Sequence, residues 1–149
     1  MHSLRQRLNA RDESGFTLIE LLVVLIIIGV LLAIAIPSYL GFQKKAQSTA
    51  AASDVRSAIP DAEAYYSDHN NYTGMDAPTL KSTYDSGMKV QDLTATPPVP
   101  DGIVSAKPEG TGDQQYCISA EVGGHWADVT GPGGTVTQEP DSVTADPCP

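Results

Sequence analysis

The chain has 149 residues, and its 18 acidic side chains outnumber its 9 basic ones, giving a formal net charge of −9. A surface with this acidic surplus disfavours nonspecific binding to nucleic acid, whose phosphates are also negative. A chain of this length encloses only a small core, which excludes a large soluble protein built around deeply buried apolar helices.

An apolar run from Phe16 to Ile36 dominates the N-terminal part of the chain. Its 21 residues would form a helix of roughly 30 Å, about the thickness of the hydrocarbon core of a membrane. Large aliphatic side chains lie on every side of such a helix, so it is neither an amphipathic surface helix nor one that this chain can bury. The sequence therefore predicts a transmembrane helix over residues 16–36.

The basic residues around this run predict its orientation. Arg5, Arg7 and Arg11 precede the run, whereas only Lys44 and Lys45 follow it closely. This small excess favours a cytoplasmic N-terminus. The chain beyond Lys45 contains 4 basic and 15 acidic residues, a composition that fits an exported domain.

Two residues at the start of the run set it apart from an ordinary secretory signal. In such a signal the small residue at the cleavage site follows the apolar region, whereas Gly15 precedes it. Cleavage after Gly15 would remove a leader of residues 1–15 and leave the helix on the mature chain. Glu20 then places a carboxylate within the helix, where it needs a partner or must reach the lipid headgroups.

Beyond Pro37 the helical pattern continues with a single apolar side. Apolar residues recur at spacings of three and four, which indicates a stripe that packs against another layer. The expected stripe consists of Ala52, Val55, Ile59, Ala62 and Tyr66. We expect one helix from about residue 16 to about residue 69, with residues 37–70 as its amphipathic continuation and with a bend at Pro60.

The remaining residues, 71–149, are predicted to form a globular β-domain. A short helical turn is expected at 78–84, and strands are expected at 89–95, 102–107, 115–122, 125–130 and 135–138. Apolar and polar residues alternate over 115–122, as in a half-buried strand. Gly123-Gly124 is a candidate for a tight hairpin turn. The predicted fold class is α+β, with a long N-terminal helix packed on a small antiparallel sheet.

The sequence contains no recognisable catalytic, metal or cofactor motif. It lacks a serine elbow, a phosphate-binding loop, a zinc-binding helix pattern and a calcium loop. Cys117 and Cys148 both lie in the part expected outside the cytoplasm, where a disulfide is the default. The alternatives are two unpaired thiols or a metal site, although two cysteines without neighbouring histidines make a poor zinc site.

The segment Gly15-Phe16-Thr17-Leu18-Ile19-Glu20-Leu21-Leu22 resembles the class III signal of type IV pilins and type II secretion pseudopilins. The resemblance continues through Gly29 and over residues 33–39, so it covers about the first quarter of the chain. Its most specific feature is a glycine followed by a phenylalanine, with a glutamate at the fifth position of the membrane helix.

This resemblance implies that a prepilin peptidase cuts between Gly15 and Phe16 and that the new Phe16 amine is methylated. It also implies that Glu20 pairs with the amine of a neighbouring subunit, and the alternative for a single chain is that Glu20 simply reaches the headgroups. Gly29 and Pro37 are expected to break the helix. The family suggests that helicity is lost there inside filaments, and the alternative is a slightly bent membrane helix.

The resemblance further implies a pilin-like fold and assembly into a helical homopolymer. The expected partners are copies of the chain, a prepilin peptidase, an inner-membrane assembly platform, minor pilins and, before assembly, lipid. The expected location is the inner membrane as a single-pass precursor, then an extracellular pilus used for adhesion, twitching motility or DNA uptake.

Two rival functions remain open at this point. One is a pseudopilin of a type II secretion system, against which the Cys117 and Cys148 pair and the absent calcium-loop pattern argue. The other is a single-pass membrane-anchored binding module. A cleavable junction between Gly15 and Phe16 and a carboxylate at Glu20 argue against that module, because an anchor needs neither.

Overall fold

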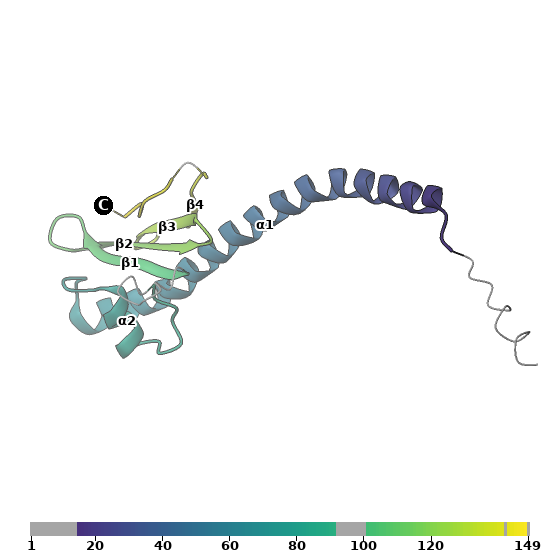
Figure 1. Cartoon of the computed structure of the whole chain (residues 1–149). Coiled ribbons are helices and arrows are strands. Elements are labelled where there is room, and N and C mark those ends of the chain that lie inside the picture. The colour runs from purple at the N-terminus through teal and green to yellow at the C-terminus, as the bar shows by residue number, and fades with distance from the viewer. Residues whose placement is uncertain (1–14, 92–100, 142, 149) are drawn as a thin grey trace, which may run out of the picture. The chain divides into compact units, whose positions relative to one another are not determined.

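The computed structural model describes residues 15–91, 101–141 and 143–148, so residues 1–14 of the expected leader lie outside the described residues. Figure 1 shows the helices α1 and α2 and a sheet of strands β1 to β4. The chain divides into two compact units, Met1–Leu40 and Gly41–Pro149. Helix α1 (Leu18–His69) contributes residues to both of them.

Helix α1 begins two residues later than the expected start at Phe16. The later start arises because Thr17 is the N-cap, whose hydroxyl accepts a hydrogen bond from the N–H of Glu20 at 3.3 Å. The helix ends at His69, as expected. It stops there because Asn70 adopts a left-handed φ of 59°, which short polar side chains tolerate better than most.

Helix α1 continues through Gly29, Pro37 and Pro60. Each proline removes one backbone donor from the helix, and a helix of 52 residues retains hydrogen bonds on both sides of it. The loss of helicity expected near Gly29 and Pro37 concerns the assembled filament and stays a prediction.

In the second unit, α1 packs a face of small side chains against the sheet. Its buried residues are Ala51, Ala52, Val55, Ala58, Ala62 and Tyr65. The expected stripe is confirmed: Ala52, Val55 and Ala62 are buried in this core, and Ile59 and Tyr66 pack against it while only partly buried. Alanines let a helix approach a sheet closely, so they occupy the centre of the contact while larger side chains fill its edge.

The sheet is antiparallel and its strands are ordered as in the chain, β1-β2-β3-β4. They are β1 (Gly102–Glu109), β2 (Gln115–Val122), β3 (His125–Gly131) and β4 (Thr137–Gln138). Gly123 and Gly124, both with positive φ, form the tight turn between β2 and β3. The predicted α+β class is confirmed.

The strand predicted at 89–95 is wrong in its described part. Only Val90 pairs with the sheet, through a single parallel bridge to Ile103. The register of β1 shifts between Ile103 and Ser105, and a strand bent by such a shift presents little straight edge for a further partner. Residues 92–95 lie outside the described residues.

The other elements differ from expectation only at their ends. β1 runs two residues further than predicted, β3 runs one residue further, and β4 begins two residues later. The short helix expected at 78–84 is α2 (Ala77–Thr83). The Asp76 carboxylate caps it by accepting a hydrogen bond from the N–H of Thr79 at 2.7 Å, and Pro78 occupies its first turn, where no donor is needed.

The two faces of the sheet have different characters. The face toward α1 is apolar and includes Tyr116, Ile118 and Val129. Because side chains alternate along a strand, the opposite face carries polar residues, and the register places Ser119 between Ser105 and Asp128. Ser105 and Ser119 are nevertheless buried, which requires a cover on that side.

Candidate processing and assembly site

The junction between Gly15 and Phe16 lies just before α1 and is open. Phe16 is 88% exposed. A Cβ built on Gly15 would meet no described atom within 4 Å. A peptidase must draw the bond it cuts into its own active site, and nothing in the described chain obstructs that approach.

Thr17 and Glu20 form a reciprocal pair at the start of α1. The backbone N–H and the hydroxyl of Thr17 both donate to Glu20 Oε2, at 2.8 and 2.7 Å. The N–H of Glu20 donates back to the hydroxyl of Thr17 at 3.3 Å. This arrangement is a capping box, which satisfies donors that the first helical turn would otherwise leave unpaired.

The role of Thr17 was not predicted from the sequence. The signal was available, because Thr-x-x-Glu directly before an apolar run is the pattern of a capping box. Glu20 thus has a local role at the helix start besides the assembly role that the family resemblance implies.

The Glu20 carboxylate has one oxygen to spare. Both bonds from Thr17 end on Oε2, and Oε1 accepts no hydrogen bond from any residue that the structure describes. Since Thr17 directly follows Phe16, the capping box holds this carboxylate close to the peptide that joins the two residues. Oε1 therefore remains available to a further donor while Oε2 keeps the cap in place.

The part of α1 in the first unit exposes its large apolar side chains. Leu18 is 82% exposed and Ile34 is 71% exposed. Within the described ranges, α1 is the helix long and apolar enough to cross a membrane. Leaving a large aliphatic side chain in water forgoes about 1.5–3 kcal/mol, so this segment requires lipid or protein around it.

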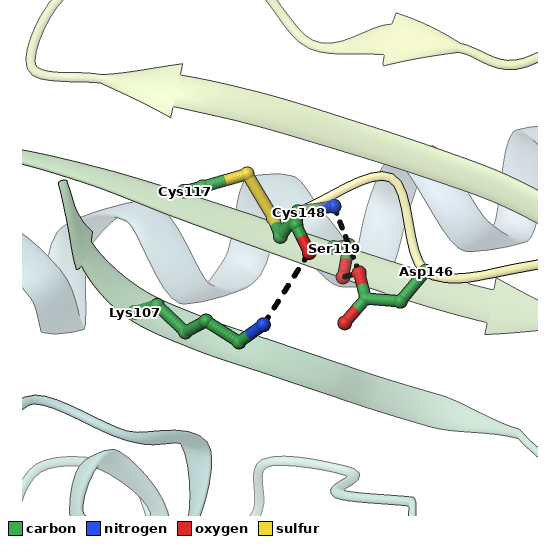
Figure 2. The surroundings of a disulfide bond; sticks show 5 residues. All are labelled: Lys107, Cys117, Ser119, Asp146 and Cys148. Atoms are coloured by element: carbon green, nitrogen blue, oxygen red, sulfur yellow. Dashed lines mark hydrogen bonds between the residues drawn. A yellow bond between two sulfur atoms is a disulfide. The ribbon is translucent and has the colours of Figure 1, made fainter.

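In the second unit, the structure joins Cys117 of β2 to Cys148 by a disulfide. Figure 2 shows that the chain around Cys148 lies over the polar face of the sheet. The Asp146 carboxylate accepts hydrogen bonds from the Ser119 hydroxyl at 2.5 Å and from the N–H of Cys148 at 2.9 Å. Lys107 Nζ donates to the Cys148 carbonyl at 3.3 Å. We call residues 143–148 the C-terminal strap, because these contacts fasten them across β1 and β2.

A further contact ties the chain before the strap to α1. Asp141 forms an ion pair with Lys44 Nζ at 2.8 Å, and its other carboxylate oxygen lies 3.2 Å from His125 Nδ1. The hydrogen bond from Lys44 is the main reason that the pKa of Asp141 lies below its usual value. The two partners of Asp141 lie far away in the chain, so no local sequence pattern indicates these contacts.

The structure thus places the expected site residues in two groups. Gly15, Phe16 and Glu20 lie together at the start of α1, with Gly29 and Pro37 further along the same helix. Cys117 and Cys148 lie in the second unit. In the described part of the chain, no three His, Cys, Asp or Glu side chains converge as metal ligands.

Comparison with known proteins supplies an independent finding. The family model described as the prokaryotic N-terminal methylation motif matches residues 10–36. The type IV wide pilus major component PilA4 of Thermus thermophilus is 42% identical over 77 residues, which cover 49% of this chain and 59% of that protein. The type IV major pilin protein PilE1 of Neisseria gonorrhoeae is 34% identical over 110 residues, which cover 67% of this chain and 46% of that protein.

A second kind of relative also matches the chain. The type II secretion system core protein G of Dickeya chrysanthemi is 32% identical over 111 residues, which cover 71% of this chain and 67% of that protein. The matches to two of the most similar relatives span 59% and 54% of those proteins, about half of their length. No solved structure matches the chain.

Proposed function

Because the chain belongs to the family of type IV pilins and type II secretion pseudopilins, we propose that it is the structural subunit of a type IV pilus. In this proposal the chain is first a single-pass precursor in the inner membrane, with its N-terminus in the cytoplasm. It then polymerises through α1 into an extracellular filament that serves adhesion, twitching motility or DNA uptake.

The observation that carries this proposal is an exposed apolar helix that begins with a carboxylate, Glu20, of which only one oxygen is hydrogen-bonded within the described residues. Cleavage between Gly15 and Phe16 frees the amine of Phe16, which is methylated in a separate step. Glu20 Oε2 keeps the bonds from Thr17 while Oε1 receives the amine of a neighbouring copy. An unmatched charge inside an apolar core costs several kcal/mol, so this pairing sets the register between subunits.

The proposal names several partners besides copies of the chain. A prepilin peptidase acts on the open junction at Gly15 and Phe16, and lipid surrounds α1 before assembly. An inner-membrane platform drives polymerisation, and minor pilins join the filament. The chain itself converts no substrate in this scheme.

The second candidate is a pseudopilin of a type II secretion system. It is favoured by the match to core protein G of Dickeya chrysanthemi, which extends over 71% of this chain. The disulfide between Cys117 and Cys148 favours a pilin, because a C-terminal disulfide-bounded loop resembles the pilins more closely. The two candidates share the leader, the helix and Glu20, so they differ in where the processed chain accumulates.

The test is the intact mass and N-terminal sequence of the protein from filaments sheared off the cell surface. A chain that starts at methylated Phe16 in this fraction is the result expected for a pilus subunit. A processed chain found only in membranes would favour the pseudopilin. A chain in membranes that keeps its leader would overturn both and favour a simple membrane anchor.

A further inference from the structure

The loop directly after α1 contains the tripeptide Asn71-Tyr72-Thr73. An asparagine followed two positions later by threonine, with a residue other than proline between them, is the acceptor pattern for a sugar on an amide nitrogen. The sequence contains three asparagines, and this pattern occurs once. The pilin function proposed above makes no use of it.

The fold presents this tripeptide at the surface and fixes its backbone. Tyr72 is buried, its N–H donates to the Asp113 carbonyl at 2.9 Å, and its own carbonyl accepts from the N–H of Met75 at 2.9 Å. Asn71 is partly exposed and Thr73 is exposed. The central residue therefore anchors the loop in the core, while the two residues that define the pattern face the solvent side.

The amide of Asn71 has a hydrogen to spare. Its Oδ1 accepts a hydrogen bond from the N–H of Thr73 at 2.9 Å, and its Nδ2 donates to the His69 carbonyl at 3.2 Å. An amide nitrogen carries two hydrogens, and Nδ2 makes no second donation to any residue in the described part of the chain. One hydrogen can be replaced by a substituent while the other still binds His69.

We propose that Asn71 is a site of N-linked glycosylation. The donor is a sugar activated at its anomeric carbon as a phosphate or diphosphate ester. Nδ2 attacks that carbon, the carbon–oxygen bond to the phosphate breaks, and the phosphate leaves with the electron pair. The proton lost from Nδ2 passes to a base of the transferase, so the step involves no oxidation or reduction.

The position suits a subunit that must also assemble. Asn71 follows the end of α1, whereas the apolar segment that requires lipid or other copies lies at its beginning. Its neighbours Asn70 and Thr73 are polar and exposed, so a sugar there adds to an already hydrated loop. The inference rests on the export that the proposed function requires.

The test is peptide mapping by mass spectrometry of the protein isolated from its own cells. The peptide that contains Asn71 is expected to be heavier than its sequence by the mass of one or more sugar residues. Fragmentation should place the added mass on the Asn71 side chain. The gain should disappear in Asn71→Gln and in Thr73→Val, which removes the hydroxyl of the acceptor pattern but keeps the side-chain size.

Three matched variants keep the acceptor pattern and separate it from the folding of the loop. Thr73→Ser retains a hydroxyl, and Asn70→Gly removes the neighbouring amide at a φ of 59° that suits glycine. Asp113→Asn weakens the bond that the Thr73 hydroxyl makes to Asp113 Oδ2 at 2.7 Å. All three should keep the added mass.

The same spectra also report the N-terminus, so the two proposals fail separately. An unmodified peptide around Asn71 in a chain that begins at Phe16 would overturn the glycosylation and leave the pilin proposal standing. Added mass on a serine or threonine would overturn it as well. A chain that keeps its leader would instead count against the proposed function.

Discussion

Tyr116 of β2 donates a hydrogen bond from its phenolic oxygen to Glu63 Oε1 of α1 at 3.1 Å. Tyr72 approaches the other oxygen of Glu63 at 3.5 Å, and the rings of Tyr72 and Tyr116 meet edge to face with centroids 4.9 Å apart. Both tyrosines are buried. One carboxylate on the helix thus joins the sheet to the loop after α1.

This relationship predicts a loss of stability on removal of the hydroxyl. Tyr116→Phe should lower the free energy of unfolding of the full chain in detergent by about 1–2 kcal/mol, because a partly buried carboxylate loses a donor. Urea unfolding followed by circular dichroism measures the change. Tyr39→Phe, at an exposed tyrosine, is the control and should have little effect. Equal losses in the two variants would contradict the prediction.

The same two tyrosines predict that the fold becomes less stable at alkaline pH. Burial, followed by the charge of Glu63, raises the pKa of Tyr72 to about 12 and raises the pKa of Tyr116 further. A raised pKa means that the folded state favours the neutral phenol. This contribution is complete below the ordinary tyrosine pKa of about 10 and is lost as pH rises toward the folded value. Stability measured across this range should fall less steeply in Tyr116→Phe than in the unchanged chain.

Replacement of Gly131 by alanine is predicted to destabilise the fold. A Cβ at this position of β3 would overlap the ring of Tyr116 on the neighbouring strand. Gly131→Ala should therefore destabilise the chain by about 1–3 kcal/mol, as overpacking of a core does. At Gly87 a Cβ would meet only the side-chain oxygen of Asp85 at 3.2 Å, so Gly87→Ala is the matched control. Similar unfolding midpoints for the two variants would show that the strand moves aside freely.

The capping box and the assembly role of Glu20 are predicted to be separable. Thr17→Val removes the capping hydroxyl at a cost of about 1 kcal/mol to the helix start, but leaves the carboxylate charged. Glu20→Gln keeps an acceptor for Thr17 but removes the charge that would match a neighbour's amine. Sheared surface filaments, quantified against total processed protein, should persist in Thr17→Val and disappear in Glu20→Gln. Normal filaments from Glu20→Gln would rule out the proposed pairing.

The disulfide is predicted to hold the C-terminal strap over the polar face of the sheet. Cys117 and Cys148 are separated by 31 residues, and a loop of this length corresponds to about 3–4 kcal/mol of stabilisation in chain-entropy models. Replacing both by serine should therefore increase amide hydrogen exchange around Ser119, which Asp146 of the strap now covers. Exchange in α2 serves as the internal reference. Unchanged exchange at Ser119 would mean that the hydrogen bonds alone retain the strap.

The carboxyl group of Asp128 predicts a second pH dependence of stability, at acidic pH. Burial, together with the neighbouring carboxyl of Glu139, raises the pKa of Asp128 to about 6. The protonated form therefore stabilises the fold below the unfolded pKa of about 4, and this contribution is lost as pH rises through about 6. Asp128→Asn should be more stable than the unchanged chain at pH 8, by an amount on the order of 1 kcal/mol after allowance for solvent screening. The two chains should converge near pH 4, and a gap that is independent of pH would disprove this origin.

The sequence alone determines those features that depend only on residues close together in the chain. The apolar run at 16–36, the junction of Gly15 and Phe16, and the position of Glu20 can be read without a fold, because composition and local spacing define them. The same holds for the hairpin turn at Gly123-Gly124, whose backbone requires glycine, and for the end of α1 at His69.

The tertiary structure decided which distant residues meet. Alanines lie at the centre of the helix–sheet contact, because their small side chains let the helix approach the sheet. Helical period alone does not show which positions of the stripe are buried most deeply. The partners of Glu63 and Asp141 come from other elements, so no local pattern could reveal them. In its described part, the strand predicted at 89–95 is reduced to a single bridge at Val90, because the bend in β1 leaves little straight edge for pairing. Local spacing determined the element types and the expected processing junction of this chain, whereas packing between elements determined their exact faces, ends and ion pairs.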